Sequence, residues 1–411
     1  MNIRSLLYLI FILAVGFFAS VADLALGRAG LMPVQPTYLA LATLLGVSLS
    51  EALFTANNSA DQQARIYTLA QNKAVLVLYT VVAVISVISG MLPEALWVEG
   101  GKWIFLIPLG LVLWVATIFI AGTSAFSSAG LLGVRLAWAG LIGSTIYEMF
   151  FPATFSNLAA RPAGFAGNAN FGALASSMLC AASLYYRPHT HLLRDVGILS
   201  ATFIAVVATQ SRSGLLEFLV VGIFWGASLI SQLRRSPVKL LKTALLMGVA
   251  AVTLALGLVI VFTQSEVFSN QSSRFSRILS GKDVDDGSGD ERLSAAADTL
   301  RHIAESPIIG YGTGFSRTLE TFPHNIYLQQ WVNNGLLGVL GYLAMLIWAG
   351  VIFSRGRYLP GCTFIAVTIV GGFFSHNILD QKSFILPFAI LLSSSASLIR
   401  ERSSTPAMLS S

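Results

Sequence analysis

Long apolar stretches separated by short polar segments run through almost the whole chain. A helix that crosses a membrane needs about 20 mostly apolar residues, and about twelve stretches approach or reach that length. The predicted spans lie near residues 5–22, 36–54, 74–92, 103–121, 129–151, 169–186, 195–209, 214–230, 241–263, 333–353, 362–374 and 383–399. Some neighbouring boundaries could merge, so ten or eleven spans remain an alternative. We expect a single integral membrane domain over residues 1–411.

The composition agrees with an all-α polytopic membrane protein. Hydrophobic residues make up 55% of the chain and charged residues 11%, whereas an ordinary soluble domain carries about 25% charged residues. The first apolar stretch also has the basic start of a signal peptide, but the many similar stretches after it favour a first span that stays in place. Cys180 and Cys362 are far apart in sequence, so the chain contains no CxxC motif.

The basic residues are distributed unevenly between the two sides of the predicted spans. With a cytoplasmic N-terminus, the cytoplasmic segments hold thirteen Lys and Arg residues. The short outer loops hold five, which are Arg28, Lys102, Arg161, Arg212 and Lys382. Because Lys and Arg favour cytoplasmic loops, this asymmetry predicts that both ends are inside. It also accounts for the net charge of +6 without a nucleic-acid partner.

One long segment, residues 264–332, then faces outward as a large loop. Its apolar residues recur at helical spacing; they are Leu293, Ala296, Ala297, Leu300 and Ile303. We expect an amphipathic helix over residues 292–303 that lies against the membrane bundle. The acidic run DVDDGSGDE is not a calcium loop, because Gly287 and Ser288 occupy its fifth and sixth positions.

Three arginines are candidates for binding a phosphorylated ligand. Arg161 lies in the turn LAARPAGFAGNANFGA, Arg212 in the turn ATQSRSGLL, and Arg292 opens the loop helix. A guanidinium offers a fixed and permanently charged fork to phosphate. The alternative is that Arg161 and Arg212 reach lipid phosphates at the membrane surface, and that Arg292 is solvated like Arg301 of the same helix.

His324 is the candidate base, in the stretch PHNIYLQQWVNNGLLG. Pro323 biases the residue before it to an extended conformation, so we expect His324 at the outer N-terminus of the tenth span, with Asn325 and Tyr327 beside it. The positive potential of a helix N-terminus favours the neutral imidazole, which can accept a proton. An interfacial histidine satisfied by water or lipid headgroups is the alternative.

Five further ionisable residues could assist this site or pair with another charge. His376, in FFSHNILDQKSF, could assist His324, and Asp380 and Lys382 of the same stretch could pair with each other. Glu217, five residues after Arg212, lies within a predicted span, where an ionisable residue is usually partnered or functional. Glu217, like Glu148 at the end of the fifth span, could counter an arginine.

Three stretches together resemble the O-antigen ligase and polymerase superfamily. They are RPAGFAGNANFGA, TQSRSG, and ERLSAAADTLRHIAESPIIGYGTG followed by PHNIYLQQWVNNGLLG, and the resemblance covers roughly residues 155–345. It implies a C-type glycosyltransferase-like membrane fold that uses no metal or other cofactor. Many relatives have proline where this chain has Ala169, which loosens that turn slightly.

The resemblance implies an O-antigen ligase of the bacterial inner membrane. Such an enzyme transfers O-antigen polysaccharide from undecaprenyl pyrophosphate to lipid A–core oligosaccharide at the periplasmic face, which makes residues 264–332 a periplasmic loop. By matched position, Arg212 and Arg292 would hold the donor pyrophosphate and His324 would act on the acceptor hydroxyl. The role of Arg161 transfers less surely.

Three other functions stay open at this point. A polymerase of the same superfamily would extend the polysaccharide on its lipid carrier, and a protein O-oligosaccharyltransferase would attach it to protein hydroxyls. Protein-directed members often carry a sizeable soluble C-terminal region, and the short segment after the last predicted span favours the ligase. A polytopic transporter or flippase would show related halves, which the sequence does not, and no ATP-binding loop is present.

Overall fold

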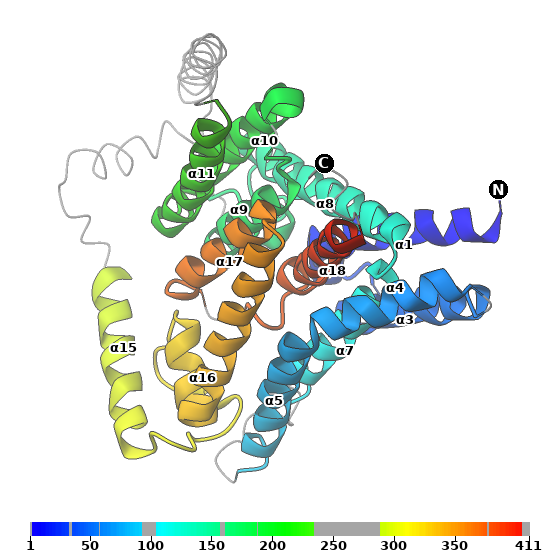
Figure 1. Ribbon diagram of the computed structural model, residues 1–411. Coiled ribbons are helices and arrows are strands. Elements are labelled where there is room, and N and C mark those ends of the chain that lie inside the picture. Colours follow the sequence, from blue (N-terminus) through cyan, green and yellow to red (C-terminus); the bar gives the residue numbers. More distant parts are fainter. Residues whose placement is uncertain are drawn as a thin grey trace.

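The computed structural model describes residues 2–32, 35–56, 58–92, 104–156, 161–186, 188–233, 288–375 and 378–404, and every regular element within them is a helix (Figure 1). The first half of the chain forms α1 (Ile3–Ala19), α2 (Ala22–Arg28), α3 (Pro36–Phe54), α4 (Ser59–Gln71), α5 (Lys73–Ser89), α7 (Leu106–Ala121) and α8 (Ser124–Phe150). The predicted all-α class is therefore confirmed for these residues.

The second half supplies the remaining helices. They are η2 (Gly164–Ala166), α9 (Ala169–Ser183), α10 (Pro188–Thr209), α11 (Arg212–Leu233), α15 (Ser288–Glu305), η3 (Phe315–Arg317), α16 (Ile326–Arg355), α17 (Leu359–Gly372) and α18 (Lys382–Ser404). The predicted ninth span, 241–263, lies outside the described residues, as do residues 264–287 of the predicted loop.

Six of the described helices are long and apolar enough to cross a membrane. The number rises to eight if α1 with α2 and α4 with α5 each form one span, because each pair is bent by 62° at its break. The shorter apolar helices α7 and α17 fall below the length limit. The chain is thus a multi-pass membrane protein, while the count of about twelve spans stays a prediction.

The centre of the bundle is α9, which packs against α8, α10, α11, α17 and α18. Thirteen of its 15 residues are buried, and most of them are alanine, serine or glycine. Small side chains let helix backbones approach closely where lipid removes the usual hydrophobic drive. At Gly214 of α11, an added Cβ would overlap that of Ala173 in α9, so this glycine allows the two helices to touch.

Candidate active site

The helix that follows His324 reverses its direction at Gly335. This residue lies within α16 but has φ 66° and ψ −170°, which is not helical. In a straight helix two residues fifteen positions apart would lie about 22 Å apart, yet the ring centroids of Tyr327 and Tyr342 are 5.9 Å apart. Residues 326–334 therefore form a short helix folded back against the long apolar part that follows (Figure 1).

The reversal corrects the prediction that HNIYLQQWVNN leads straight into the tenth span. The sequence on both sides of Gly335 has a helical pattern, so the local sequence does not predict that the chain reverses there. The cause lies in a different part of the chain, in the glycine-rich segment GYGTG at residues 310–314.

That segment wraps around the break and supplies its hydrogen bonds. The backbone N–H of Tyr311 donates to the carbonyl of Val332, and that of Gly312 to the carbonyl of Asn333, both at 2.8 Å. Its three glycines, at positions 310, 312 and 314, have φ values of 75°, 106° and 96°, which side chains with a Cβ rarely adopt. A Cβ on Gly335 would overlap the carbonyl oxygen of Ile308. The glycine-rich segment at residues 310–314 and the break at Gly335 can therefore pack this closely only because their glycines lack side chains.

His324 lies immediately before the cap of the short helix. The Oδ1 atom of Asn325 accepts hydrogen bonds from the backbone N–H groups of Tyr327 at 2.9 Å and Leu328 at 3.2 Å, as a helix N-cap does. The His324 side chain is exposed, with its ring centroid 6.4 Å from that of Phe322. The predicted position just before a helix N-terminus is confirmed, but the helix is the short one.

Tyr327 fixes the start of this short helix to the end of α17. Its Oη donates to the carbonyl of Ile369 at 2.6 Å. A Cβ on Gly372 would lie 2.8 Å from the same Oη, so a glycine is needed for the hydroxyl to reach that carbonyl. The Tyr327 ring also packs on Phe373, with centroids 4.8 Å apart.

The same end of α17 touches α11, which begins at Arg212. The Arg212 side chain is exposed, whereas Glu217, five residues on, is only 1% exposed. The Glu217 Oε1 lies 3.3 Å from where a Cβ on Gly371 would stand. Glu217 forms no ion pair with a basic side chain in the described part of the chain, so its expected pairing with an arginine is wrong there. Glu217 therefore lies against the same end of α17 that Tyr327 contacts at Gly372.

Arg161 connects the turn before α9 with the turn before α11. Its Nε donates to the carbonyl of Thr209 at 3.2 Å, and its Nη2 donates to Asn170 Oδ1 at 2.9 Å. Thr209 is followed by Gln210, with φ 54°, and then by the start of α11. Arg161 therefore orients the segment that carries Arg212.

Glu148 also shapes this turn. As expected, its charge acts on an arginine, because it favours the charged form of Arg28, although the two side chains form no close ion pair among the described residues. Its Oε1 accepts the backbone N–H groups of residues 155 and 156, and its Oε2 accepts those of residues 163 and 164. A carboxylate can accept several such bonds at once. Glu148 thus shapes the chain on both sides of residues 157–160 and leads it to Arg161.

The predicted loop helix is present as α15 and packs on α16. Its buried residues are Ala295, Thr299 and Ile303, whereas Leu293 and Leu300 are 72% and 49% exposed. The predicted apolar face is therefore partly wrong, because the helix packs through a different stripe that contains small side chains. Arg292 is exposed, so it does not pack inward.

The stretch between α17 and α18 departs from its predicted pairing. His376 lies outside the described residues. Lys382 does not pair with Asp380; its Nζ lies 2.9 Å from Asp23 Oδ2 of α2, and both side chains are buried. Burial outweighs the nearby Arg317 and Lys382 and raises the pKa of Asp380 from 3.8 to about 6.

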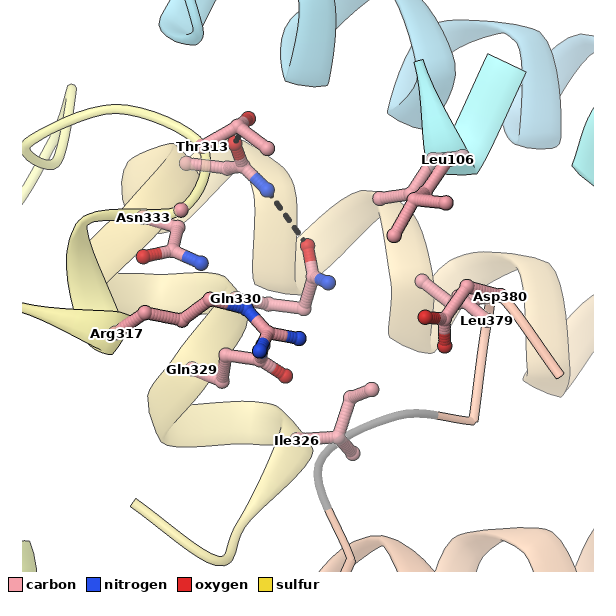
Figure 2. Close-up of a pocket in the computed structure, with 12 residues that line it drawn as sticks. Leu106, Thr313, Arg317, Ile326, Gln329, Gln330, Asn333, Leu379 and Asp380 are labelled. Atoms are coloured by element: carbon pink, nitrogen blue, oxygen red, sulfur yellow. Dashed lines mark hydrogen bonds between the residues drawn. The ribbon is translucent and has the colours of Figure 1, made fainter. Parts of the chain in front are cut away.

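A small polar cavity of about 50 Å³ lies beside the short helix (Figure 2). Its polar lining residues are Thr313, Arg317, Gln329, Gln330, Asn333, Asn334 and Asp380. Figure 2 shows the Arg317 guanidinium between Gln329 and Gln330, with Asp380 on the facing side. The Arg317 Cζ also lies 5.6 Å from the centroid of the Phe322 ring, which is the ring next to His324.

Sequence reasoning missed this group. Arg317 stands in no repeated motif, and the amides of α16 look like the polar stripe of an ordinary helix. Only the fold-back at Gly335 and the approach of the α17–α18 connection bring these side chains together. Within the described residues, no group of three or more His, Cys, Asp or Glu side chains could hold a metal ion.

The family model described as O-antigen ligase matches residues 197–343. The chain carries an O-antigen ligase family domain. The resemblance to the O-antigen ligase and polymerase superfamily is thereby confirmed. A search of curated proteins gave no match.

The O-antigen ligase domain runs from within α10 into α16. It includes Arg212, Arg292, Arg317 and His324, and it includes both the GYGTG segment and the Gly335 break that it closes. Arg161 and the α17–α18 connection with Asp380 lie outside the matched residues. They reach the domain through the contacts with Thr209 and the polar cavity described above.

Proposed function

We propose that this protein is an O-antigen ligase, a glycosyltransferase that moves O-antigen polysaccharide from undecaprenyl pyrophosphate to lipid A–core oligosaccharide. The observation that carries the proposal is the family match over the segment that holds Arg212, Arg292 and His324. We place the protein in the bacterial inner membrane, with this site facing the periplasm. The excess of basic residues in the predicted cytoplasmic segments supports that orientation.

The donor brings its own leaving group, so no nucleotide enters the reaction. As the bond between the anomeric carbon and the pyrophosphate oxygen breaks, negative charge collects on the lipid pyrophosphate. Arg212 and Arg292 supply the positive charge that stabilises it, because both are exposed for contact with a ligand. Arg161 supports them by holding the carbonyl of Thr209 just before α11.

His324 acts on the acceptor. A neutral imidazole takes the proton of the acceptor sugar hydroxyl as its oxygen attacks the anomeric carbon. A new glycosidic bond forms, undecaprenyl pyrophosphate leaves, and the single displacement inverts the configuration. The cap at Asn325 and the bond from Tyr327 to Ile369 hold the histidine in place, and Glu217 packs behind the same turn of α17.

A polymerase and a protein O-oligosaccharyltransferase share the donor and differ in the acceptor. The family match agrees with either, and the overall similarity of the motifs favours the ligase. A transporter or flippase is the less favoured alternative, since the sequence shows no related halves. The partners of the proposed reaction are the two lipid-linked saccharides within the membrane, with no nucleic acid.

The test is complementation of a ligase-deficient bacterium, with surface lipopolysaccharide separated on a gel. The wild-type chain should restore the ladder, and His324→Ala at equal membrane abundance should lose it, since a general base contributes about 10²- to 10⁴-fold. Glu320→Gln, an exposed change in the same segment, should keep it. A ladder from His324→Ala equal to the wild type would remove the proposed base. Restoration only in a polymerase-deficient strain would replace ligase by polymerase.

A further inference from the structure

A second cavity, of about 390 Å³, lies at the end of the bundle opposite His324. It is lined by residues from the first part of α8, the segment after α9, the beginnings of α10 and α17, and the last turns of α18. The candidate active site uses the other ends of α9, α10, α17 and α18. The two sites are therefore separated by the length of the helices.

Arg135 is the arginine that lines this cavity, and it falls inside the predicted fifth span. Its Nε donates to the carbonyl of Ser183 at 3.4 Å, and its Cζ lies 4.0 Å from the centroid of the Tyr185 ring. The terminal nitrogens, Nη1 and Nη2, form no hydrogen bond or ion pair with any residue the structure describes. An arginine inside a membrane segment is usually partnered or functional.

The ring under Arg135 is itself held firmly. The buried Asp195 carboxylate accepts the backbone N–H of Tyr185 at 2.9 Å and of Tyr186 at 3.1 Å, and the indole N–H of Trp225 at 3.1 Å. The His191 ring also packs on Tyr185, with centroids 4.3 Å apart. The guanidinium is thus seated on a fixed platform, and its Nη edge is left for a ligand.

The cavity wall also contains hydroxyl groups from α8 and α18. Ser397 is only 8% exposed, and its Oγ has no hydrogen-bond partner among the described residues. Ser127 and Ser394, also in the lining, bond to each other at 2.8 Å. A buried hydroxyl without a partner is costly, so a ligand that supplies an acceptor would satisfy Ser397.

We propose that this cavity binds the phosphate group of an anionic membrane phospholipid. The Nη edge of Arg135 matches phosphate oxygens in geometry and charge. Leu131, Leu184 and Leu398 add apolar lining next to it, and exposed Leu132 and Leu136 flank Arg135 on α8, as acyl chains require. Basic pockets between membrane helices are a known setting for such headgroups.

The charges around the cavity favour an anionic lipid over a zwitterionic one. Arg355 and Arg357 are exposed at this end of the bundle and would repel a choline group. Glu401, from the last turns of α18, also lines the cavity, but it is exposed. Its negative charge should weaken the binding of an anionic headgroup without preventing it.

The test uses the full-length protein purified in detergent and titrated with phosphatidylglycerol, with retained lipid counted by native mass spectrometry. Arg135→Gln should bind this lipid about tenfold or more weakly, with Arg135→Lys in between. Arg194→Gln is the matched control, because Arg194 also lies over Tyr185, at 5.9 Å, but outside the cavity lining. Ser397→Leu should block the cavity with Arg135 intact, and Glu401→Gln should tighten binding.

Two further probes separate the sources of phosphate. Phosphatidylcholine should bind about tenfold more weakly than phosphatidylglycerol, and glycerol 3-phosphate should not displace the lipid at millimolar concentration. Displacement by glycerol 3-phosphate would contradict the proposal that the ligand is a phospholipid and would indicate a soluble phosphate compound instead. Equal retention of phosphatidylglycerol by the wild type, Arg135→Gln and Ser397→Leu, each monodisperse by size exclusion, would overturn the site.

Discussion

The rings of Tyr327 and Tyr342 lie with centroids 5.9 Å apart, although the two residues are fifteen positions apart in the sequence. This contact exists because the chain turns back at Gly335. It brings the segment after His324 against the long part of α16 and the end of α17. The geometry of the candidate active site follows from that reversal.

The reversal should not tolerate a side chain at Gly335. Gly335→Ala places a Cβ at φ 66° against the carbonyl oxygen of Ile308, and a backbone conformation that is essentially restricted to glycine costs about 1–3 kcal/mol by itself. We expect a Tm several degrees lower in detergent and loss of the lipopolysaccharide ladder. Gly350→Ala in the same helix, where the nearest atom to the added Cβ is 4.0 Å away, should match the wild type. A normal Tm for Gly335→Ala would contradict the account.

Loss of the Tyr327 hydroxyl should lower the rate of transfer clearly and lower the thermal stability only slightly. Tyr327→Phe keeps the contact with Tyr342 and removes the 2.6 Å bond to Ile369, which contributes about 1 kcal/mol. We expect a small fall in Tm and a clear fall in the rate of transfer, measured with purified donor and acceptor. Tyr38→Phe, at a position 49% exposed on α3, is the control. Full activity in Tyr327→Phe would show that His324 does not depend on this bond.

Two arginines on α15, Arg292 and Arg301, should differ in how much they contribute to the rate of transfer from the donor. Arg292→Gln should reduce transfer about 10²-fold, as loss of one charge-stabilising group does, with partial recovery in Arg292→Lys. Arg301→Gln, at a side chain 76% exposed that lies 3.9 Å from Asp298, should leave transfer unchanged. The assay is the initial rate against donor concentration. Equal losses in the two glutamine variants would indicate a general surface charge effect.

Asp380 should make stability depend on pH. Its pKa is raised from 3.8 to about 6 by burial, so the folded state holds this proton more tightly than the unfolded chain. Its contribution is fully present below pH about 4 and is lost as the pH rises through about 6. Asp380→Asn, which resembles the neutral form, should match the wild type near pH about 4 and exceed it at neutral pH, by at most about 3 kcal/mol.

The measurement is Tm against pH in detergent. Asp298→Asn on the surface of α15 is the control and should follow the wild type at every pH. Arg317→Gln should move the wild-type transition to higher pH, because Arg317 stabilises the charged carboxylate. Parallel curves for Asp380→Asn and the wild type would argue against a raised pKa.

The helical class, the short turn between α10 and α11 that holds Arg212, and the helix N-terminus after His324 could all be predicted from local pattern. A polar cap such as Asn325 and a run of apolar residues act within a few positions of themselves. The pairing of Lys382 could not be predicted, because Asp23 is more than 350 positions away in sequence. The same holds for Glu148, whose four N–H donors became evident only with the turn folded.

The sequence by itself determined that this is a helical membrane protein with an O-antigen ligase domain, because hydropathy and motif spacing are properties of the linear chain. The tertiary structure decided that α16 folds back at Gly335, that Arg161 orients the turn before Arg212, and that Arg317 and Asp380 share a cavity. Each of these depends on atoms from distant segments competing for the same space and the same hydrogen bonds. The steric overlap between Gly335 and Ile308 and the bond from Tyr327 to Ile369 are settled only when the helices pack.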